Sequence, residues 1–371
     1  MKRSFAAPLL AASVLVAAAA RAPAAASGAE DAFRQFDFWV GEWSVQNRHL
    51  QPDGTWLDGD VTRARIVPVL GGQAVLEEWA GPFRSGYMNG FSLRAFDPAA
   101  ERWVILLSWT GDGNSTFGRM RGSFRHGRGE FVAPETGPRR QRYTFSDALA
   151  DSVRWDSART TDGGRTWSTD WIMEFSRTRA AAEVDDELLF GTGWNEGQLT
   201  PHTEARALDW MLGSWRGHAE TGPGADADPS QDAGGRPLEA RLRCRLLNKD
   251  CLVLDVLETR AAADQPWSGS LHVGGFVPGQ SAWESWSLTS DDTRFARWSG
   301  RDLVRASDGM RLVYRDPAGA THERLLIPLR TGSPGARVER MRIEEVVLRT
   351  SGPKAAESEL VRTVFLERVD G

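Results

Sequence analysis

Two adjacent carboxylates are the best candidates for acid–base chemistry in this chain. Glu77 and Glu78 lie in an apolar segment that ends at Trp79. Because side chains alternate between the two faces of a strand, Glu77 and Trp79 share one face and Glu78 points the other way. If the strand belongs to a closed barrel, one carboxylate points into the interior. There it could act as an acid or base with a raised pKa, or form an ion pair with Arg94 or Arg119, which we favour.

The histidines form no recognisable metal-binding motif. No two of the six lie two or four residues apart, so a local zinc site is not expected. A G-x-S-x-G nucleophile elbow, a phosphate-binding loop and a dinucleotide fingerprint are also missing from the sequence. We therefore predict no metal and no cofactor, and we favour a non-catalytic protein over an enzyme.

One segment, T-T-D-G-G-R-T-W at Thr160–Trp167, matches the Asp-box pattern of sialidases. In that pattern the aspartate accepts hydrogen bonds from turn amides, a glycine adopts a positive φ and the tryptophan packs beneath the turn. A sialidase needs several copies at the spacing of propeller blades, and the sequence has one. We therefore predict a structural hairpin built on Asp162, Gly164 and Trp167.

An internal repeat defines the domain organisation. The phrase F-D-F-W-V-G-E-W at Phe36–Trp43 recurs as L-D-W-M-L-G-S-W at Leu208–Trp215, 172 positions later. A repeat of this length indicates two copies of one domain, and equivalent tryptophans such as Trp43 and Trp215 favour a packing role. The predicted divisions are a first domain at 31–178, an acidic linker at 179–200 and a second domain at 201–371.

The repeat also relates the carboxylates of the two copies. Alignment of the hairpin segments Val67–Glu78 and Cys244–Asp255 places Leu254 at the position of Glu77 and Asp255 at the position of Glu78. By this alignment the second copy keeps one carboxylate of the two.

Most of the remaining sequence is typical of short strands. The run W-V-I-L-L-S-W at Trp103–Trp109 has the length of a strand, and Gly71-Gly72 and Gly163-Gly164 mark turns. Helical periodicity occurs only at Ala32–Phe38 and Thr203–Met211, before each G-x-W phrase. We therefore predict an all-β protein with two tandem antiparallel up-and-down β-barrels, each with a short helix before its first strand.

The N-terminus has the features of a secretory signal at residues 1–27. A basic start precedes an Ala-rich apolar core at Phe5–Ala20, and A-x-A at Ala24–Ala26 offers a cleavage site. The core is too short for a confident membrane span, and no later apolar run approaches the required length. We expect a periplasmic or secreted protein with no membrane span after cleavage. The net charge of −5, from 45 basic and 50 acidic residues, argues against a nucleic-acid partner.

Both cysteines lie in the second copy. Cys244 and Cys251 flank R-L-L-N-K-D, whose polar N-K-D favours a turn between two apolar strands. In such a hairpin the two side chains could lie across from each other, and an exported protein can form disulfides. We predict a disulfide between them.

The order of these elements resembles the calycin superfamily, which includes lipocalins, fatty-acid-binding proteins and nitrobindins. The sequence is more similar to the DUF1579-like bacterial proteins, which share F-D-F-W-x-G-x-W, an L-G-G hairpin, an F-D-P turn and D-G-G-x-T-W. The first copy matches over most of 31–178, whereas the second lacks the last element. The matching segments are Phe36–Trp43, Leu70–Trp79, Phe96–Trp109 and Asp162–Trp167.

The resemblance implies two further features. In calycins an arginine from a late strand covers the G-x-W tryptophan, so Arg177 and Arg368 are the expected partners of Trp43 and Trp215. A nitrobindin-like haem would need a histidine on a late strand, and the two terminal strands contain none. Haem is therefore not expected, and His272 on a predicted strand of the second copy is the best remaining candidate for it.

The favoured function is binding of a small, largely apolar or aromatic molecule inside the first barrel. Two alternatives stay open: a structural protein of the envelope with filled barrels, and a calycin-type isomerase or hydratase that uses Glu77. The predicted ligand-binding residues are Glu77, Trp79, Tyr87, Trp109 and Arg119.

Overall fold

The computed structural model describes most of the chain downstream of residue 30. The described residues are 31–83, 86–109, 117–134, 137–184, 203–221, 237–247, 252–300, 309–316, 320–330, 337–349 and 357–369. The predicted signal at 1–27 and residues 185–200 of the predicted linker lie outside them.

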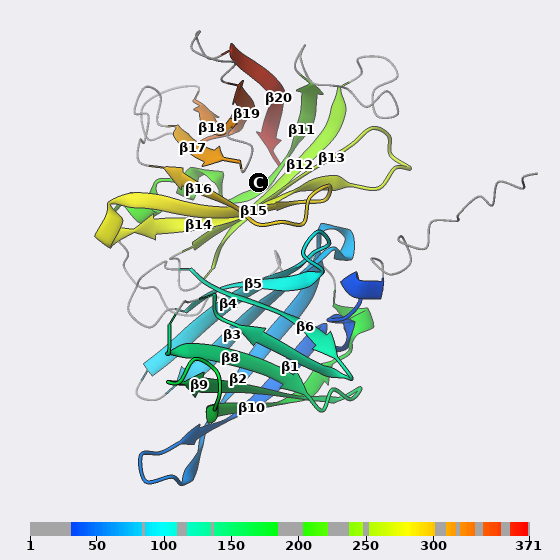
Figure 1. The fold of residues 1–371 in the computed structure, drawn as a ribbon. Coiled ribbons are helices and arrows are strands. Elements are labelled where there is room, and N and C mark those ends of the chain that lie inside the picture. Colours follow the sequence, from blue (N-terminus) through cyan, green and yellow to red (C-terminus); the bar gives the residue numbers. More distant parts are fainter. Residues whose placement is uncertain are drawn as a thin grey trace, which may run out of the picture.

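The first copy is a closed barrel of ten antiparallel strands in sequence order, with β1 paired to both β2 and β10 (Figure 1). Its strands are β1 (Gly41–Leu50), β2 (Trp56–Val69), β3 (Ala74–Phe83), β4 (Gly86–Asp97), β5 (Arg102–Trp109), β6 (Gly118–Arg125), β7 (Arg128–Val132), β8 (Arg140–Ser146), β9 (Ser152–Thr160) and β10 (Ser168–Arg179).

The second copy repeats this topology, with β11 paired to both β12 and β20. Its strands are β11 (Gly213–Thr221), β12 (Leu238–Leu247), β13 (Leu252–Arg260), β14 (Ser268–Val277), β15 (Ala282–Thr289), β16 (Ala296–Gly300), β17 (Met310–Arg315), β18 (Thr321–Leu329), β19 (Arg340–Arg349) and β20 (Glu357–Arg368). The prediction of two tandem up-and-down barrels is confirmed.

Every second side chain along a strand points into the barrel and fills its interior. In β1 the residues Gly41, Trp43, Val45 and Asn47 are buried, while those between them are partly exposed. Alternate residues therefore point inward, as in any strand with one face on a core. Because neighbouring strands are antiparallel, the ends of β1, β3, β5, β7 and β9 and the starts of β2, β4, β6, β8 and β10 all lie at one end of the first barrel, here called the open end.

The opposite, closed end of each barrel is capped by a short helix and an arginine. Before β1 and β11 the chain forms the 3-10 turns η1 (Asp37–Trp39) and η5 (Asp209–Met211), as predicted. The guanidinium carbon of Arg177 lies 3.9 Å from the Trp43 ring centre, and that of Arg368 lies 4.1 Å from the Trp215 ring centre. Both expected cation–π pairs are confirmed. The remaining 3-10 turns are η2 (Leu70–Gly72), η3 (Ala181–Glu183), η4 (Thr203–Arg206) and η6 (Pro278–Gln280).

The two barrels share an apolar interface. In Figure 1 the strands β14 and β15 of the second barrel lie against the side of the first barrel that carries β4 and β5. Outward-facing residues of both barrels form one buried cluster there. Its members include Val67, Leu76, Leu93, Leu106, Leu254, Leu271 and Val273. Strand β3 is consequently buried on both faces from Ala74 to Gly81.

Polar contacts cross the same interface. Arg245 donates to both oxygens of Glu78 at 2.7 and 3.1 Å, and the Thr293 hydroxyl donates to the Phe96 carbonyl at 2.6 Å. Burial raises the pKa of Glu78, and the positive charge of Arg245 opposes that shift. The ion pair therefore lies within an interface that is otherwise largely apolar.

The start of the predicted linker belongs to this packed structure. Strand β10 ends at Arg179, η3 follows, and Val184 is buried in the apolar cluster between the barrels. Arg179 therefore belongs to β10, and Val184 is the one buried residue among 180–184, whose other members are exposed; the linker stays a prediction for the rest of its length.

The cysteines are not placed as the sequence suggested. Cys244 is buried on β12, and its cross-strand neighbour on β13 is Asp255. The expectation that Cys251 lies opposite Cys244 is wrong, because the hairpin register extends farther than the N-K-D turn implied. Cys251 itself lies outside the described residues, so the disulfide stays a prediction.

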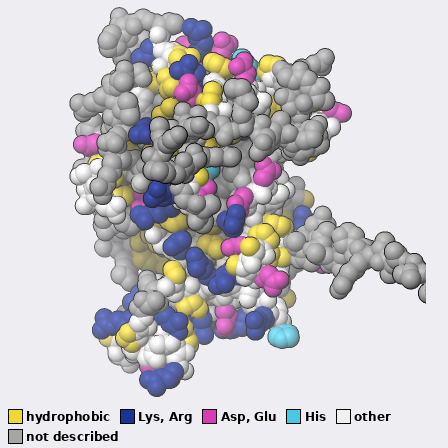
Figure 2. Space-filling model, turned by 45° about the horizontal axis from the view of Figure 1, so that its top comes forward, with side chains coloured by type: hydrophobic (Ala, Val, Ile, Leu, Met, Phe, Trp, Pro, Cys, Tyr) yellow, Lys and Arg dark blue, Asp and Glu magenta, His cyan; other side chains and the backbone are white. Residues whose placement is uncertain are grey.

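The visible surface in Figure 2 carries basic and acidic side chains next to each other. Oppositely charged side chains form ion pairs in both barrels, such as Arg48 with Asp58 at 2.9 Å and Arg297 with Glu284 at 2.7 Å. Within the ranges described above, no helix is long and apolar enough to cross a membrane.

Candidate functional site

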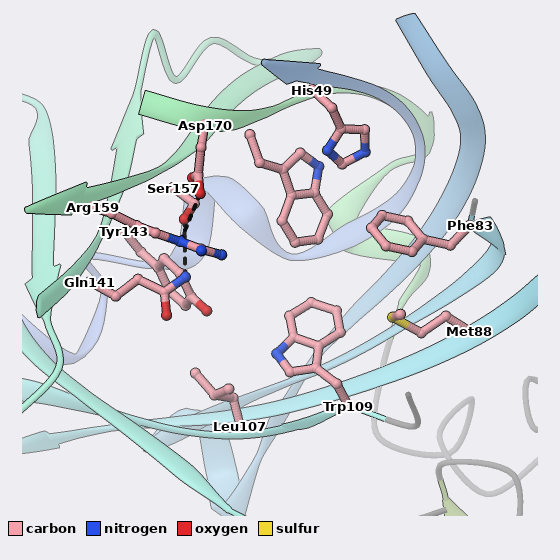
Figure 3. A pocket seen from close by; sticks show the side chains of 11 residues that line it. His49, Phe83, Met88, Leu107, Trp109, Gln141, Tyr143, Ser157, Arg159 and Asp170 are labelled. Atoms are coloured by element: carbon pink, nitrogen blue, oxygen red, sulfur yellow. Dashed lines mark hydrogen bonds and ion pairs between the residues drawn. The ribbon is translucent and has the colours of Figure 1, made fainter. Parts of the chain in front are cut away.

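A pocket of about 350 Å³ occupies the open end of the first barrel (Figure 3). It is built by side chains near the ends of seven strands that all reach this end. The residues that line it are His49, Phe83, Met88, Leu107, Trp109, Gln141, Tyr143, Ser157, Arg159, Asp170 and Trp171.

The pocket has an apolar side and a polar side. Phe83, Met88 and Trp109 lie together on one side in Figure 3, and Arg159 and Asp170 lie on the other. Arg159 and Asp170 form an ion pair at 2.7 Å, and Gln141 donates to the Ser157 hydroxyl at 3.1 Å. Such a lining, which combines aromatic and aliphatic side chains with fixed polar groups, is typical of sites for small organic molecules.

At the rim, His49 stacks on Trp171 with ring centres 5.4 Å apart and planes inclined by 29°. The Trp171 indole donates to the Asn47 amide oxygen at 3.0 Å, which fixes the orientation of its ring. Asn47 is buried. The aromatic wall is thus held in place before any molecule enters.

A second layer of tryptophans supports this wall. The Trp79 ring centre lies 5.5 Å from Trp109, and the Trp155 ring centre lies 5.2 Å from Trp171, both edge to face. Edge-to-face contacts of this kind stabilise aromatic clusters by about 0.5–1.5 kcal/mol each. The pocket wall is therefore rigid on its apolar side.

The pocket continues outward into a wider region of about 690 Å³. The β1–β2 hairpin contributes its own side chains to this region, including Leu50, Gln51, Leu57 and Asp58. His49 and Phe83 line both spaces, so the hairpin borders a route from the surface into the pocket.

Beneath the pocket lies a small cavity of about 20 Å³ that shares Leu107, Trp109 and Tyr143 with it. Glu77 and Arg94 also line this cavity.

A buried ion pair holds this inner cavity together. Arg94 donates to Oε2 of Glu77 at 2.8 Å, and the Ser92 hydroxyl donates to the same oxygen at 2.6 Å. The guanidinium carbon of Arg94 stacks 3.9 Å from the Trp39 ring centre. This ion pair is the structural alternative that the sequence favoured for Glu77.

Tyr143 is the polar group at the boundary of the two spaces. Burial raises its pKa to about 12, with a hydrogen bond from Trp109 acting in the opposite direction. The hydroxyl therefore stays protonated at neutral pH, and it presents no negative charge to the pocket.

The predicted site residues separate into two groups. Trp109 lines both cavities, Glu77 lines the inner one, and Trp79 packs against Trp109. Tyr87 does not line the pocket, because its neighbour Met88 takes the inward position on β4. Arg119 lies on the outer face, with its guanidinium carbon 5.0 Å from the Trp286 ring centre of the second barrel. The structure therefore does not bring Tyr87 and Arg119 to this pocket.

Sequence reasoning missed several lining residues. His49 comes from β1, whereas Tyr143, Arg159 and Trp171 come from β8, β9 and β10, about 100 positions later in the chain. Their shared signal is position, since each lies near the end of a strand that reaches the open end. This position identifies a residue as part of the pocket lining only when the strand ends are known.

The second barrel contains a buried polar cluster of its own. Arg324 donates to both oxygens of Asp255 at 2.7 and 3.2 Å, and its side chain is fully buried. His272 lies opposite Asp255 on β14, where burial holds the pKa of its imidazole well below the ordinary value. The imidazole is therefore neutral near pH 7.

The strand register changes the expected correspondence between the two copies. In each barrel, the glycine of the G-x-W phrase pairs with a residue on the next strand, and that residue pairs with an inward-facing acid on the strand after it. The acid is Glu77 in the first barrel and Asp255 in the second. The alignment that paired Asp255 with Glu78 is wrong by one residue. Such a shift places a side chain on the opposite face of a strand.

The predicted hairpin at Thr160–Trp167 is confirmed. Asp162 accepts hydrogen bonds from the backbone amides of Arg165 and Thr166 at 2.9 and 3.0 Å. Gly164 has a φ of 95°, and Trp167 donates to its carbonyl at 3.1 Å. The motif closes the β9–β10 connection, which is a structural role.

Among the residues described above, no group of three or more His, Cys, Asp or Glu side chains could hold a metal ion. No protein-family model matches the chain, so the resemblance to the DUF1579-like group has no further support. No curated protein matches it either. Among solved structures, the chain is similar to a protein of unknown function from the DUF3598 family of Nostoc punctiforme PCC 73102. The two are 12% identical over 91% of this chain and 99% of the other, with a TM-score of 0.25.

Proposed function

We propose that the first barrel binds a small, planar and largely apolar molecule at its open end. The observation that carries this proposal is the pocket of about 350 Å³ walled by Phe83, Trp109 and Trp171. Flat aromatic walls favour flat ligands, because a planar ring can bury its surface in stacked or edge-to-face contacts without distorting either partner. The ion pair and the amide on the other side would orient a polar substituent.

The alternatives from the sequence receive less support. A purely structural role needs an interior filled by side chains, whereas the open end of the first barrel retains space of ligand size. An acid–base role for Glu77 needs a carboxylate free to exchange a proton. Glu77 instead accepts hydrogen bonds from Arg94 and Ser92 on one oxygen, which suits an anchoring role.

We also propose that the protein is exported. The basic start, apolar core and A-x-A of residues 1–27 favour a protein that acts in the periplasm or outside the cell. Fractionation of producing cells, with N-terminal sequencing of the mature protein, tests this part. Recovery of an intact residue 1 in the cytoplasm would contradict it.

The binding proposal is tested by native mass spectrometry of the mature protein, followed by extraction and titration of what is bound. Trp109→Ala should weaken binding roughly tenfold, since a lost aromatic contact costs on the order of 1.4 kcal/mol. The matched control is Trp267→Ala, because Trp267 packs between Arg241 and Arg260 on the second barrel. Equal affinity in both variants would refute the proposed site.

A further inference from the structure

We propose that the ligand of the first barrel carries an uncharged oxygen acceptor at its inner end, and that Arg94 selects for it. This inference rests on the proposed function, since it assigns chemistry to the floor of the same pocket. It makes Arg94 a specificity-determining residue for aryl ketones, aldehydes and similar neutral compounds over hydrocarbons and carboxylates.

The inner cavity has the size for a single group of this kind. Its volume is about 20 Å³, and it adjoins the pocket, with which it shares Leu107, Trp109 and Tyr143. A space of this size accepts about one oxygen-sized group. A ring that stacks on Trp109 in the main pocket could therefore place one substituent atom below it.

Arg94 supplies hydrogen-bond donors to that cavity. Its side chain is 3% exposed, and Nη2 binds Glu77. Nε and Nη1 are buried and have no hydrogen-bond partner among the described residues. Stacking on Trp39 fixes the plane of the guanidinium and so the directions of these donors. Leaving a buried donor without a hydrogen-bond partner costs free energy. A ligand acceptor that binds these donors therefore gains more binding free energy than the same hydrogen bond would give in water.

The charge balance decides which acceptor fits. Glu77 already neutralises Arg94 at 2.8 Å. A ligand carboxylate would bring a second negative charge close to Glu77 in a buried site, where like charges repel strongly. Tyr143 adds no charge at neutral pH because its hydroxyl is protonated. A neutral carbonyl accepts the Arg94 hydrogen bonds without that repulsion.

Three probes of similar shape test the inference by isothermal titration calorimetry on the mature protein. They are 2-acetylnaphthalene, 2-ethylnaphthalene and 2-naphthoate. The ketone should bind at least tenfold more tightly than the other two. Tightest binding by the naphthoate, or equal binding of the ketone and the hydrocarbon, would overturn the inference.

Variants test whether Arg94 is responsible for the preference for the ketone. Replacing Arg94 alone would leave the Glu77 charge buried, so the test uses Glu77→Leu with Arg94→Met, which removes both charges together. This double variant should bind the ketone and the hydrocarbon within about twofold of each other. The matched control is Arg119→Met, which changes an arginine on the outer face and should keep the full preference.

The outcomes separate the two proposals. If all probes bind equally and lose affinity in Trp109→Ala, the pocket is the binding site and the selection by Arg94 is wrong. If no probe binds, both proposals fail as stated. Thermal melting checks that the double variant folds, and if it does not, the three probes on the unaltered protein still decide the question.

Discussion

Glu77 and Asp255 occupy equivalent inward positions in the two barrels but take their arginines from different strands. Arg94 reaches Glu77 from the neighbouring strand β4, whereas Arg324 reaches Asp255 from β18 on the opposite wall. The second pair therefore spans its barrel interior, and the first leaves the interior of its barrel open above it. The position of the arginine therefore distinguishes the two barrels: the equivalent acid lies below a pocket in the first barrel and in an ion pair across the interior in the second.

The pair of Asp255 and Arg324 should be sensitive to the loss of one partner. Asp255→Leu leaves a fully buried guanidinium without its bidentate partner. We expect the free energy of unfolding to fall by about 3–5 kcal/mol, measured by urea denaturation.

The control for this prediction removes both charges. Asp255→Leu with Arg324→Met should recover much of the loss, since an apolar pair of similar volume avoids the desolvation cost. If the double variant were as unstable as the single one, packing volume rather than charge pairing would account for the effect.

The arginine at the closed end of the first barrel should not be replaceable by lysine. Arg177 donates to three carbonyls, those of Phe38, Val40 and Ala150, at 2.7, 2.5 and 2.6 Å. A lysine cannot reproduce this planar fork. Arg177→Lys should lower the free energy of unfolding by about 1–3 kcal/mol, while Arg154→Lys at a half-exposed ion pair should change it little. Similar losses in both would contradict this explanation.

The hairpin at Asp162 should stabilise the protein only while its carboxylate is charged. Hydrogen bonds from Thr166 and Thr160 hold the pKa of Asp162 well below its usual range. A carboxyl with a lowered pKa in the folded state contributes stability above its unfolded pKa of about 4 and loses it as the pH falls further. Asp162→Ala should therefore lower the melting temperature by several degrees at pH 7 and by progressively less below pH 4. Asp264→Ala, at an exposed turn, should show no such dependence.

The ion pair between the barrels also makes the effect of a substitution depend on pH. Arg245→Met removes the partner that opposes the burial-raised pKa of Glu78. A carboxyl with a raised folded pKa contributes stability below about pH 4.5 that is lost as the pH rises through the folded value. The variant should lose about 3 kcal/mol at pH 7 and approach the stability of the unaltered protein near pH 4. A loss that does not depend on pH would show that Glu78 stays neutral in both proteins.

The sequence was sufficient for features that depend on local pattern. The recurring G-x-W phrase predicted two copies, and period-two alternation correctly put Glu77 and Trp79 on one face of the strand and Glu78 on the other, with one carboxylate inside. The Asp162 hairpin was likewise predicted, because its hydrogen bonds join residues within four positions of each other. Local hydrogen bonds and the alternation of side chains need no knowledge of distant contacts.

Features that depend on distant contacts could not be predicted. Arg119 faces outward and packs on Trp286 of the second barrel, and nothing near Arg119 in the chain signals that neighbour. Asp255 was misaligned by one residue although the two hairpins have connections of equal length, and one residue of slippage reverses the face of a strand. The pocket itself joins His49 to Trp171, which meet only when β1 pairs with β10.

The apolar interface between the barrels has a consequence for how this molecule can evolve or be engineered. Each copy covers a hydrophobic wall of the other, and β3 is buried on both of its faces. A gene fragment encoding either copy alone would produce a protein with a large exposed apolar surface, which favours aggregation. The duplicated halves have thus become mutually dependent. Neither can be deleted, exchanged or transplanted as a module unless its outer wall is redesigned for water.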